Sequence, residues 1–204
     1  MSLTINCDVD GVLYEFNPEI TLHAEERFER QMPTATSWSI WEDWGITKAE
    51  WWKLFGDAIR DGVFLHGDAT EFGKGINAIK QWSEDGHRVR LVTSKGGPTN
   101  QLVAIAQRDT ISWLEQQGIL PYVEVSFTGG DKSGYLADVV IDDHPNLKWV
   151  QEGARNLLLA QPWNAHCDTI TTVTGDWLGR VPVHRIKDWE GLIHQVEIFN
   201  EVSA

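Results

Sequence analysis

Cysteine is scarce in this 204-residue chain, which contains only Cys7 and Cys167. Two cysteines so far apart form neither a disulfide framework nor a paired-cysteine metal site, which fits a reducing compartment, and we expect a cytoplasmic protein. No apolar run approaches the roughly 18 residues that a membrane helix needs. The first residues show no basic segment followed by an apolar stretch, so we expect neither a secretory signal nor a membrane-bound protein.

Positive charge is also scarce, because 17 lysines and arginines stand against 30 aspartates and glutamates, giving a formal net charge of −13. Such a chain repels a phosphate backbone, and no basic stripe compensates, so binding to long nucleic acid is disfavoured. A small phosphorylated substrate stays compatible, since a metal ion and one or two lysines can hold it. The length and the hydrophobic content of 42% predict one packed core with a small inserted subdomain.

Most of the chain alternates between strand-like and helix-like segments. The predicted strands are 3–5, 88–94, 122–127, 138–143, 155–160 and a last one near 183–186, and the predicted helices are 17–31, 73–85, 100–117 and one that begins at 189. Strands that alternate with helices indicate a mostly parallel sheet. We therefore expect an α/β, Rossmann-like fold with helices on both faces of the sheet.

Residues 33–66 break this alternation and hold five of the 11 tryptophans. Thr47 and Glu50 have the spacing of a capping box and predict a helix that ends near Asp61. We interpret 33–66 as a small helical cap, inserted after the first β-α unit of a core formed by 1–32 and 67–204. Most cap aromatics are expected to fill the cap's own core, and one or two to contact substrate. The candidates for that contact are Phe64, Trp38, Trp41 and Trp44.

Two aspartates, Asp8 and Asp10, directly follow the first predicted strand, and Gly11 comes next. In open α/β sheets, ligands bind at the carboxyl ends of the strands. Two carboxylates held close together repel each other unless a cation or a proton intervenes, and Mg²⁺ prefers oxygen ligands. A carboxylate beside such a metal can attack phosphorus. The same letters also suit a surface turn, so this motif alone does not decide the function.

Three later segments bring compatible groups to the same edge of the predicted sheet: Thr93 with Ser94, then Lys132, then Asp142 with Asp143. Phosphoryl transfer needs an in-line nucleophile, a metal, donors for the phosphate oxygens and a cation for the developing charge. Each segment is weak evidence by itself. In this order, each at a strand end, they together indicate a phosphoryl-transfer site.

These segments resemble the four motifs of the haloacid dehalogenase superfamily and, more narrowly, the 5'(3')-deoxyribonucleotidase family. The resemblance rests on residues 8–13, 93–94, 131–132 and 137–143, with support from 161–164 and 185–189, and it spans nearly the whole chain. It implies a dehalogenase-like fold with a cap, Mg²⁺ as the cofactor, and hydrolysis of (deoxy)ribonucleoside monophosphates.

The resemblance also implies a role for each motif residue. Asp8 would be the nucleophile that forms an aspartyl-phosphate, and Asp10 would protonate the leaving oxygen and later activate water. Mg²⁺ would be held by Asp8, the main-chain carbonyl of Asp10 and one acid of the last pair. We favour Asp143 for that contact, with Asp142 behind it. The phosphate would be bound by Thr93, Ser94 and Lys132.

Lys95 departs from the family pattern, because the relatives place a proline directly after the Thr-Ser pair. It is either an additional phosphate contact or a solvated loop residue. His144 follows the acid pair and is a candidate for an indirect role at the site, whereas His166 is expected to be a loop residue. Two alternative functions stay open: a phosphatase for a sugar phosphate, and a catalytically idle binding domain with the same fold. A homodimer is compatible with the sequence.

Overall fold

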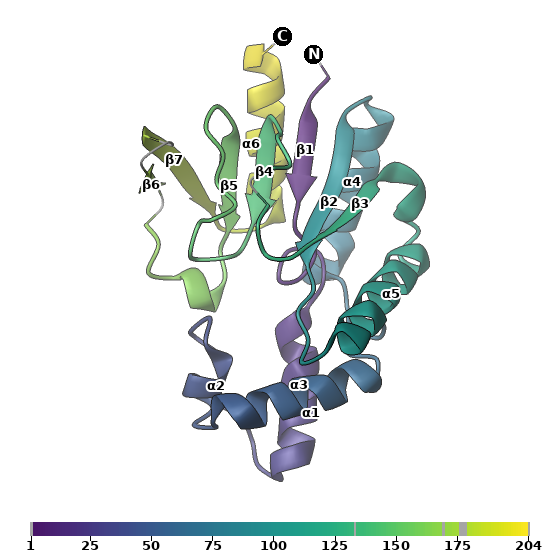
Figure 1. The fold of residues 1–204 in the computed structure, drawn as a ribbon. Helices are drawn as coiled ribbons and strands as arrows, with labels where there is room; N and C mark the ends of the chain where they lie inside the picture. The colour runs from purple at the N-terminus through teal and green to yellow at the C-terminus, as the bar shows by residue number, and fades with distance from the viewer. Residues whose placement is uncertain (1, 133, 169, 176–178, 204) are drawn as a thin grey trace.

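The computed structural model describes residues 2–132, 134–168, 170–175 and 179–203. Its seven strands form one sheet in the order β3-β2-β1-β4-β5-β7-β6 (Figure 1). All neighbouring strands are parallel except β6 and β7, which form an antiparallel pair at the edge. The mostly parallel α/β sheet predicted from the sequence is confirmed. The strands are β1 (Thr4–Cys7), β2 (Arg88–Ser94), β3 (Glu124–Thr128), β4 (Val139–Asp142), β5 (Arg155–Leu159), β6 (Ile170–Gly175) and β7 (Gly179–Ile186).

The helices agree with the predicted ranges to within a few residues. They are α1 (Phe16–Phe28), α2 (Ile40–Asp43), α3 (Lys48–Arg60), α4 (Lys74–Glu84), α5 (Asn100–Gln116) and α6 (Trp189–Ser203), with 3-10 turns η1 (Thr70–Gly73), η2 (Leu120–Tyr122) and η3 (Pro162–Asn164). In the part of the chain that the structure describes, no helix combines the length and the apolar character of a membrane span. Strand β6 was not predicted, because its sequence ITTVTG is half threonine and alternates only weakly.

One face of the sheet is covered by helices. Helix α4 contacts β2, and α6 contacts β5 and β7. The two helices also meet each other, since the rings of Trp82 and Trp189 lie 6.2 Å apart. Side chains alternate across a strand, and in β4 Val139 and Ile141 accordingly point into this main core.

The opposite face of β4 and β5 is covered differently. Val140 and Leu158 point to this side and form a second cluster with Trp149 and Val150, which come from the connection between the two strands. We expected helices on both faces, whereas here the segment 143–154 packs as an irregular loop. Its sequence contains a proline and a glycine and lacks helical periodicity.

The cap lies across the carboxyl ends of the strands, where α1, α2 and α3 gather below the sheet (Figure 1). Thr47 and Glu50 form the predicted capping box at the start of α3, with reciprocal side-chain to backbone hydrogen bonds. Helix α1 packs against α3, so in space it lies beside the cap, whereas from the sequence we placed residues 1–32 in the core. The division at 32/33 and 66/67 stays a prediction. The cap and the sheet share one hydrophobic cluster.

Candidate active site

The loop that follows β1 is tightly folded. The amides of Leu13 and Tyr14 both donate to the carbonyl of Val9, at 2.8 and 3.0 Å. Gly11 has φ +73°, and a Cβ atom at this position would lie 2.1 Å from Oδ2 of Asp143. Only glycine combines this backbone conformation with so close an approach. Gly11 therefore allows the loop after β1 to touch the loop after β4.

Three carboxylates meet where these loops touch. Oxygen atoms of Asp8, Asp142 and Asp143 all lie within 4.8 Å of one another. The Nζ atom of Lys132 lies 2.7 Å from Asp8 Oδ2 and 2.6 Å from Asp142 Oδ2. Burial alone would lower the pKa of Lys132, but the charges of Asp142 and Asp8 raise it above its usual value. Lys132 is therefore positively charged and bridges the carboxylates of Asp8 and Asp142.

One lysine does not neutralise three acids. Burial raises the pKa of Asp143 well above its usual value, and the charges of Asp142 and Asp8 raise it further. Burial also raises the pKa of Asp142, while the charge of Lys132 opposes this shift. Ionised carboxylates in such a site need additional positive charge.

The hydrogen bonds of the cluster leave a free ligand atom for a metal ion. Both oxygens of Asp142 are engaged, because Oδ2 pairs with Lys132 and Oδ1 accepts from the backbone amide of His144 at 2.9 Å. Oδ2 of Asp143 accepts from the indole of Trp163 at 3.0 Å. Its Oδ1 is buried and has no hydrogen-bond partner among the described residues. An unpaired buried carboxylate oxygen is costly, and oxygen is the ligand that Mg²⁺ prefers. The residues therefore fit a magnesium ion, with Asp143 better placed to bind it than Asp142.

The segment 161–164 holds the two loops in place. The side-chain amide of Asn164 donates to the carbonyl of Asp143 at 2.9 Å, and that of Gln161 donates to the carbonyl of Gly11 at 2.6 Å. In the sequence this segment supported only the family resemblance, and Trp163 was not predicted as a site residue. Its signal was the cluster of two amides and one indole directly after a predicted strand.

The end of β2 brings Ser94 to the site but not the hydroxyl of Thr93. Ser94 lines the cavity described below, and its Oγ donates to the carbonyl of Thr128 at 3.3 Å. Thr93 is fully buried, and its Oγ1 has no partner among the described residues and does not line the cavity. The two adjacent hydroxyls therefore differ in their access to a substrate.

Lys95 is buried, so the interpretation of it as a solvated loop residue was wrong. Its side chain is 1% exposed, and its Nζ pairs with Oδ1 of Asp10. The same atom lies 4.2 Å from the centre of the Phe64 ring. Burial raises the pKa of Asp10, and the charge of Lys95 opposes the shift.

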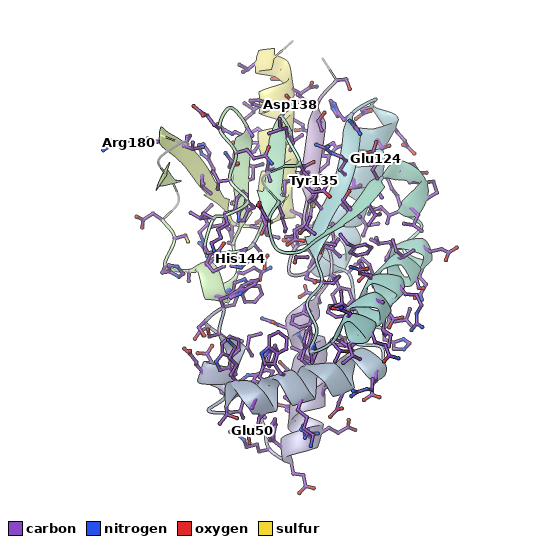
Figure 2. All side chains as sticks on the ribbon, in the orientation of Figure 1. Glu50, Glu124, Tyr135, Asp138, His144 and Arg180 are labelled. Atoms are coloured by element: carbon purple, nitrogen blue, oxygen red, sulfur yellow. The ribbon has the colours of Figure 1, made fainter. Side chains whose placement is uncertain are left out.

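A cavity of about 430 Å³ lies between the sheet edge and the cap. Its core wall is mostly polar and includes Asp8, Asp10, Ser94, Lys132 and Asp143, together with Gly11, Gly96, Gly130, His144 and Trp163. Its cap wall is mostly aromatic, with the rings of Phe16, Trp38, Trp41, Trp51, Trp52, Phe55 and Phe64, and it also includes Asn17, Ser37, Ile40 and Lys48. In Figure 2, His144 lies at the sheet edge on the side that faces α2 and α3, whereas Glu50 lies on the far side of α3.

Three of the four predicted cap aromatics line this cavity, namely Phe64, Trp38 and Trp41. Trp44 does not, because it is 1% exposed and its indole donates to the carbonyl of Pro33 at 3.0 Å. Trp44 is therefore not placed to contact a substrate in this cavity, contrary to our expectation, and instead packs within the cap itself. Trp51, Trp52, Phe55 and Phe16 line the cavity but were not among the candidates, because spacing alone does not show which face of the cap turns inward.

Trp38 joins the two walls. Its ring centre lies 3.9 Å from that of His144, which also lines the cavity. Burial lowers the pKa of His144 to about 4, and the charge of Lys132 contributes to the shift. His144 is therefore a neutral ring at neutral pH, suited to packing against Trp38.

Known proteins resemble this chain over most of its length. Residues 2–179 match the model of the family described as 5' nucleotidase, deoxy (pyrimidine), cytosolic type C protein. A protein of Chlorobaculum tepidum named "Putative 5'(3')-deoxyribonucleotidase" is 31% identical over 149 residues, which cover 71% of each chain. The resemblance stated from the motifs is thereby confirmed.

Solved structures share the fold. A haloacid dehalogenase-like family hydrolase from Xanthomonas campestris aligns with a TM-score of 0.54 at 13% identity, covering 97% of this chain and 96% of the other. A haloacid dehalogenase-like family protein from Streptococcus pneumoniae aligns with a TM-score of 0.53 at 13% identity, covering 78% and 85%. The dehalogenase-like fold expected from the sequence is confirmed.

Proposed function

We propose that this chain, which belongs to the family described as 5' nucleotidase, deoxy (pyrimidine), cytosolic type C, hydrolyses (deoxy)ribonucleoside monophosphates with Mg²⁺. Its membership of this family makes it a phosphoric monoester hydrolase. The observation that carries this proposal is the cavity, in which a wall of acids and Lys132 faces a wall of aromatic rings. A nucleoside monophosphate has the matching two parts, a charged phosphate and a planar base. Aromatic faces stack on planar rings.

In the first half-reaction, a carboxylate oxygen of Asp8 attacks phosphorus and forms an aspartyl-phosphate. The bond between phosphorus and the nucleoside oxygen breaks, and Asp10 gives its proton to that oxygen. In the second half-reaction, water attacks the same phosphorus, its proton passes to Asp10, and the bond to Asp8 breaks to release phosphate. Supporting this assignment, Asp8 and Asp10 both line the cavity, and their spacing lets one residue attack while the other transfers the proton.

The other polar residues act on charge. Lys132 contacts the Asp8 carboxylate at 2.7 Å and is placed to orient it and to bind a phosphate oxygen, with Ser94 as a further donor. Asp8, Asp143 and the carbonyl of Asp10 would hold Mg²⁺, which when bound offsets the negative charge of the acids and of the phosphate. The unpartnered Oδ1 of Asp143 supports this ligand set.

The first experiment is phosphate release with Mg²⁺ from nucleoside monophosphates and sugar phosphates, with Asp8→Asn as the blank. We expect nucleoside monophosphates to be preferred, and Asp8→Asn to lose activity by about 10⁴-fold or more while its melting temperature stays within a few degrees. A preference for sugar phosphates would show that the substrate is a sugar phosphate and not a nucleoside monophosphate. Binding of Mg²⁺ without any phosphate release would indicate a binding domain.

A second experiment addresses the covalent intermediate. Wild-type enzyme is mixed with substrate labelled in its phosphate and quenched in acid, and the label bound to the protein is counted. We expect wild type to retain label and Asp8→Asn to retain none. Equal label on both proteins, or full activity in Asp8→Asn, would exclude Asp8 as the nucleophile.

A further inference from the structure

Lys95 occupies a place that the proposed function does not use. It follows Ser94 at the end of β2, the strand beside β1, yet its own side chain does not line the cavity. The side chain is 1% exposed, whereas the Asp10 side chain that it contacts is 25% exposed. Lys95 therefore lies behind Asp10, on the side away from the substrate space.

The contacts of Lys95 are few and specific. Among the described residues its ammonium forms one ion pair, to Oδ1 of Asp10, and stands 4.2 Å from the centre of the Phe64 ring. A buried ammonium is costly unless it is paired, and an aromatic face adds a weaker attraction. A lysine enclosed in this way cannot swing out to solvent without losing both contacts.

A phosphate contact is the competing explanation, and the burial of Lys95 disfavours it. On the acid side of the cavity the cation is Lys132 and a hydroxyl donor is Ser94, and the other lysine that lines the cavity is Lys48 of the cap. The ammonium of Lys95 is instead occupied by Asp10 and covered by Phe64. Any effect of Lys95 on the reaction is therefore exerted through the carboxylate of Asp10.

We propose that Lys95 is a positioning residue, which holds Oδ1 of Asp10 so that the other carboxylate oxygen, Oδ2, faces the reacting phosphorus. This inference rests on the proposed function, in which Asp10 transfers protons. In the second half-reaction the water oxygen bonds to phosphorus, the water proton passes to Oδ2 of Asp10, and the bond from phosphorus to Asp8 breaks. A carboxylate free to rotate would meet that water less often.

The test separates the two half-reactions by using p-nitrophenyl phosphate. Its leaving group needs no proton, so the first release of p-nitrophenol does not depend on Asp10, whereas each later turnover requires the water step. In Lys95→Met we expect the burst rate constant to stay within about 3-fold of wild type, and the steady-state rate to fall by about 10- to 100-fold, part of the usual effect of general acid–base catalysis. A fall of both rates by the same factor, or no fall in either, would overturn the proposal.

The matched control is Lys80→Met. Lys80 is a partly buried lysine on α4 that donates to the carbonyl of Gln117 at 2.8 Å and does not line the cavity. We expect both rates to be unchanged in this variant. A wild-type enzyme that releases no phosphate from nucleoside monophosphates would instead refute the proposed function, so the two failures are distinguishable.

A double-mutant cycle with Asp10→Asn tests whether Lys95 works through Asp10. Residues that act as one unit show strongly non-additive effects. We expect Lys95→Met to change the steady-state rate by less than about 3-fold in the Asp10→Asn background. The full single-mutant effect in that background would show that Lys95 acts elsewhere. Lys95→Arg keeps the charge and is expected to recover part of the rate, and it replaces Lys95→Met in the cycle if the methionine variant does not fold.

Discussion

The two walls of the cavity are built in different ways. On the core wall, the polar groups lie at strand ends or in the loops that follow them and are fixed by polar contacts, such as the bond from Trp163 to Asp143 at 3.0 Å. On the cap wall, rings are held by other rings, as where Trp51 stacks on Phe55 with centres 5.6 Å apart and planes 6° from parallel. Directional bonds fix atoms to a fraction of an ångström, whereas ring packing fixes a surface.

This difference indicates which wall of the cavity tolerates amino-acid substitutions. A carboxylate shifted by 1 Å loses in-line attack or a metal contact, so the core wall tolerates few substitutions. A ring can be exchanged for another of similar size with repacking, so the cap wall can be altered to suit a different leaving group. The motifs that carry the family resemblance accordingly lie on the core side of the site.

The largest effect is expected for a metal contact on the core wall. Asp143→Asn removes a charge from the acid cluster. It also makes a weaker metal ligand of Oδ1, which has no hydrogen-bond partner among the described residues. We expect a loss of about 10³-fold in kcat at the Mg²⁺ concentration that saturates wild type, since metal stabilisation is worth several kcal/mol. We also expect the rise in melting temperature with Mg²⁺ to disappear. Asp85→Asn, at an exposed acid, is the control, and an unchanged Mg²⁺ response in Asp143→Asn would exclude Asp143 as a ligand.

A smaller loss is expected from the group that orients this ligand. Trp163→Phe keeps the ring but deletes the N–H that donates to Asp143. Loss of such an outer contact lowers metal affinity by about 10- to 100-fold, measured as the Mg²⁺ dependence of kcat. The control is Trp113→Phe, which deletes an indole bond to the carbonyl of Gly67 at 2.8 Å, away from the acids. If both variants show the same Mg²⁺ dependence, Trp163 has no special role.

On the cap wall, single changes are expected to affect substrate binding rather than chemistry. Trp38 is 47% exposed, lines the cavity and packs on His144. We expect Trp38→Ala to raise KM for a nucleoside monophosphate by about 10-fold, within the 1–3 kcal/mol of base stacking, and to leave inhibition by inorganic phosphate unchanged. Trp44→Phe should do the reverse, lowering the melting temperature without changing KM. The opposite pattern would show that the wrong tryptophan was assigned to the substrate.

The smallest effect tests the support of the cap wall without touching the cavity. Thr47→Ala removes the N-cap residue of α3, because the Thr47 side chain accepts a hydrogen bond from the amide of Glu50. We expect a loss of about 1 kcal/mol in the free energy of unfolding, measured by urea denaturation, because this is the usual value of an N-cap. Activity at 25 °C should be unchanged. A large loss of activity would mean that the position of α3 is more critical than the other cap variants suggest.

Much of the fold followed from local patterns. The strand ends at Ser94 and Asp142, and the helix that begins after Thr47, agree with the structure to within a residue, whereas the first strand ends at Cys7, two residues later than predicted. The loop cover on the second face and strand β6 did not follow, because both depend on contacts between segments far apart in the sequence. The partner of Lys95 did not follow either, since Asp10 lies 85 positions away.

The sequence by itself determined which chemical groups meet. Acids, hydroxyls and a lysine at the carboxyl ends of parallel strands share one edge of the sheet whatever the detailed packing. Only the tertiary structure decided how they are used. It turned Trp51 toward the cavity and Trp44 away from it, left one oxygen of Asp143 unpartnered, and buried Lys95 against Asp10. The positions of most strands along the chain follow from local patterns, whereas the direction and burial of a side chain depend on what packs around it.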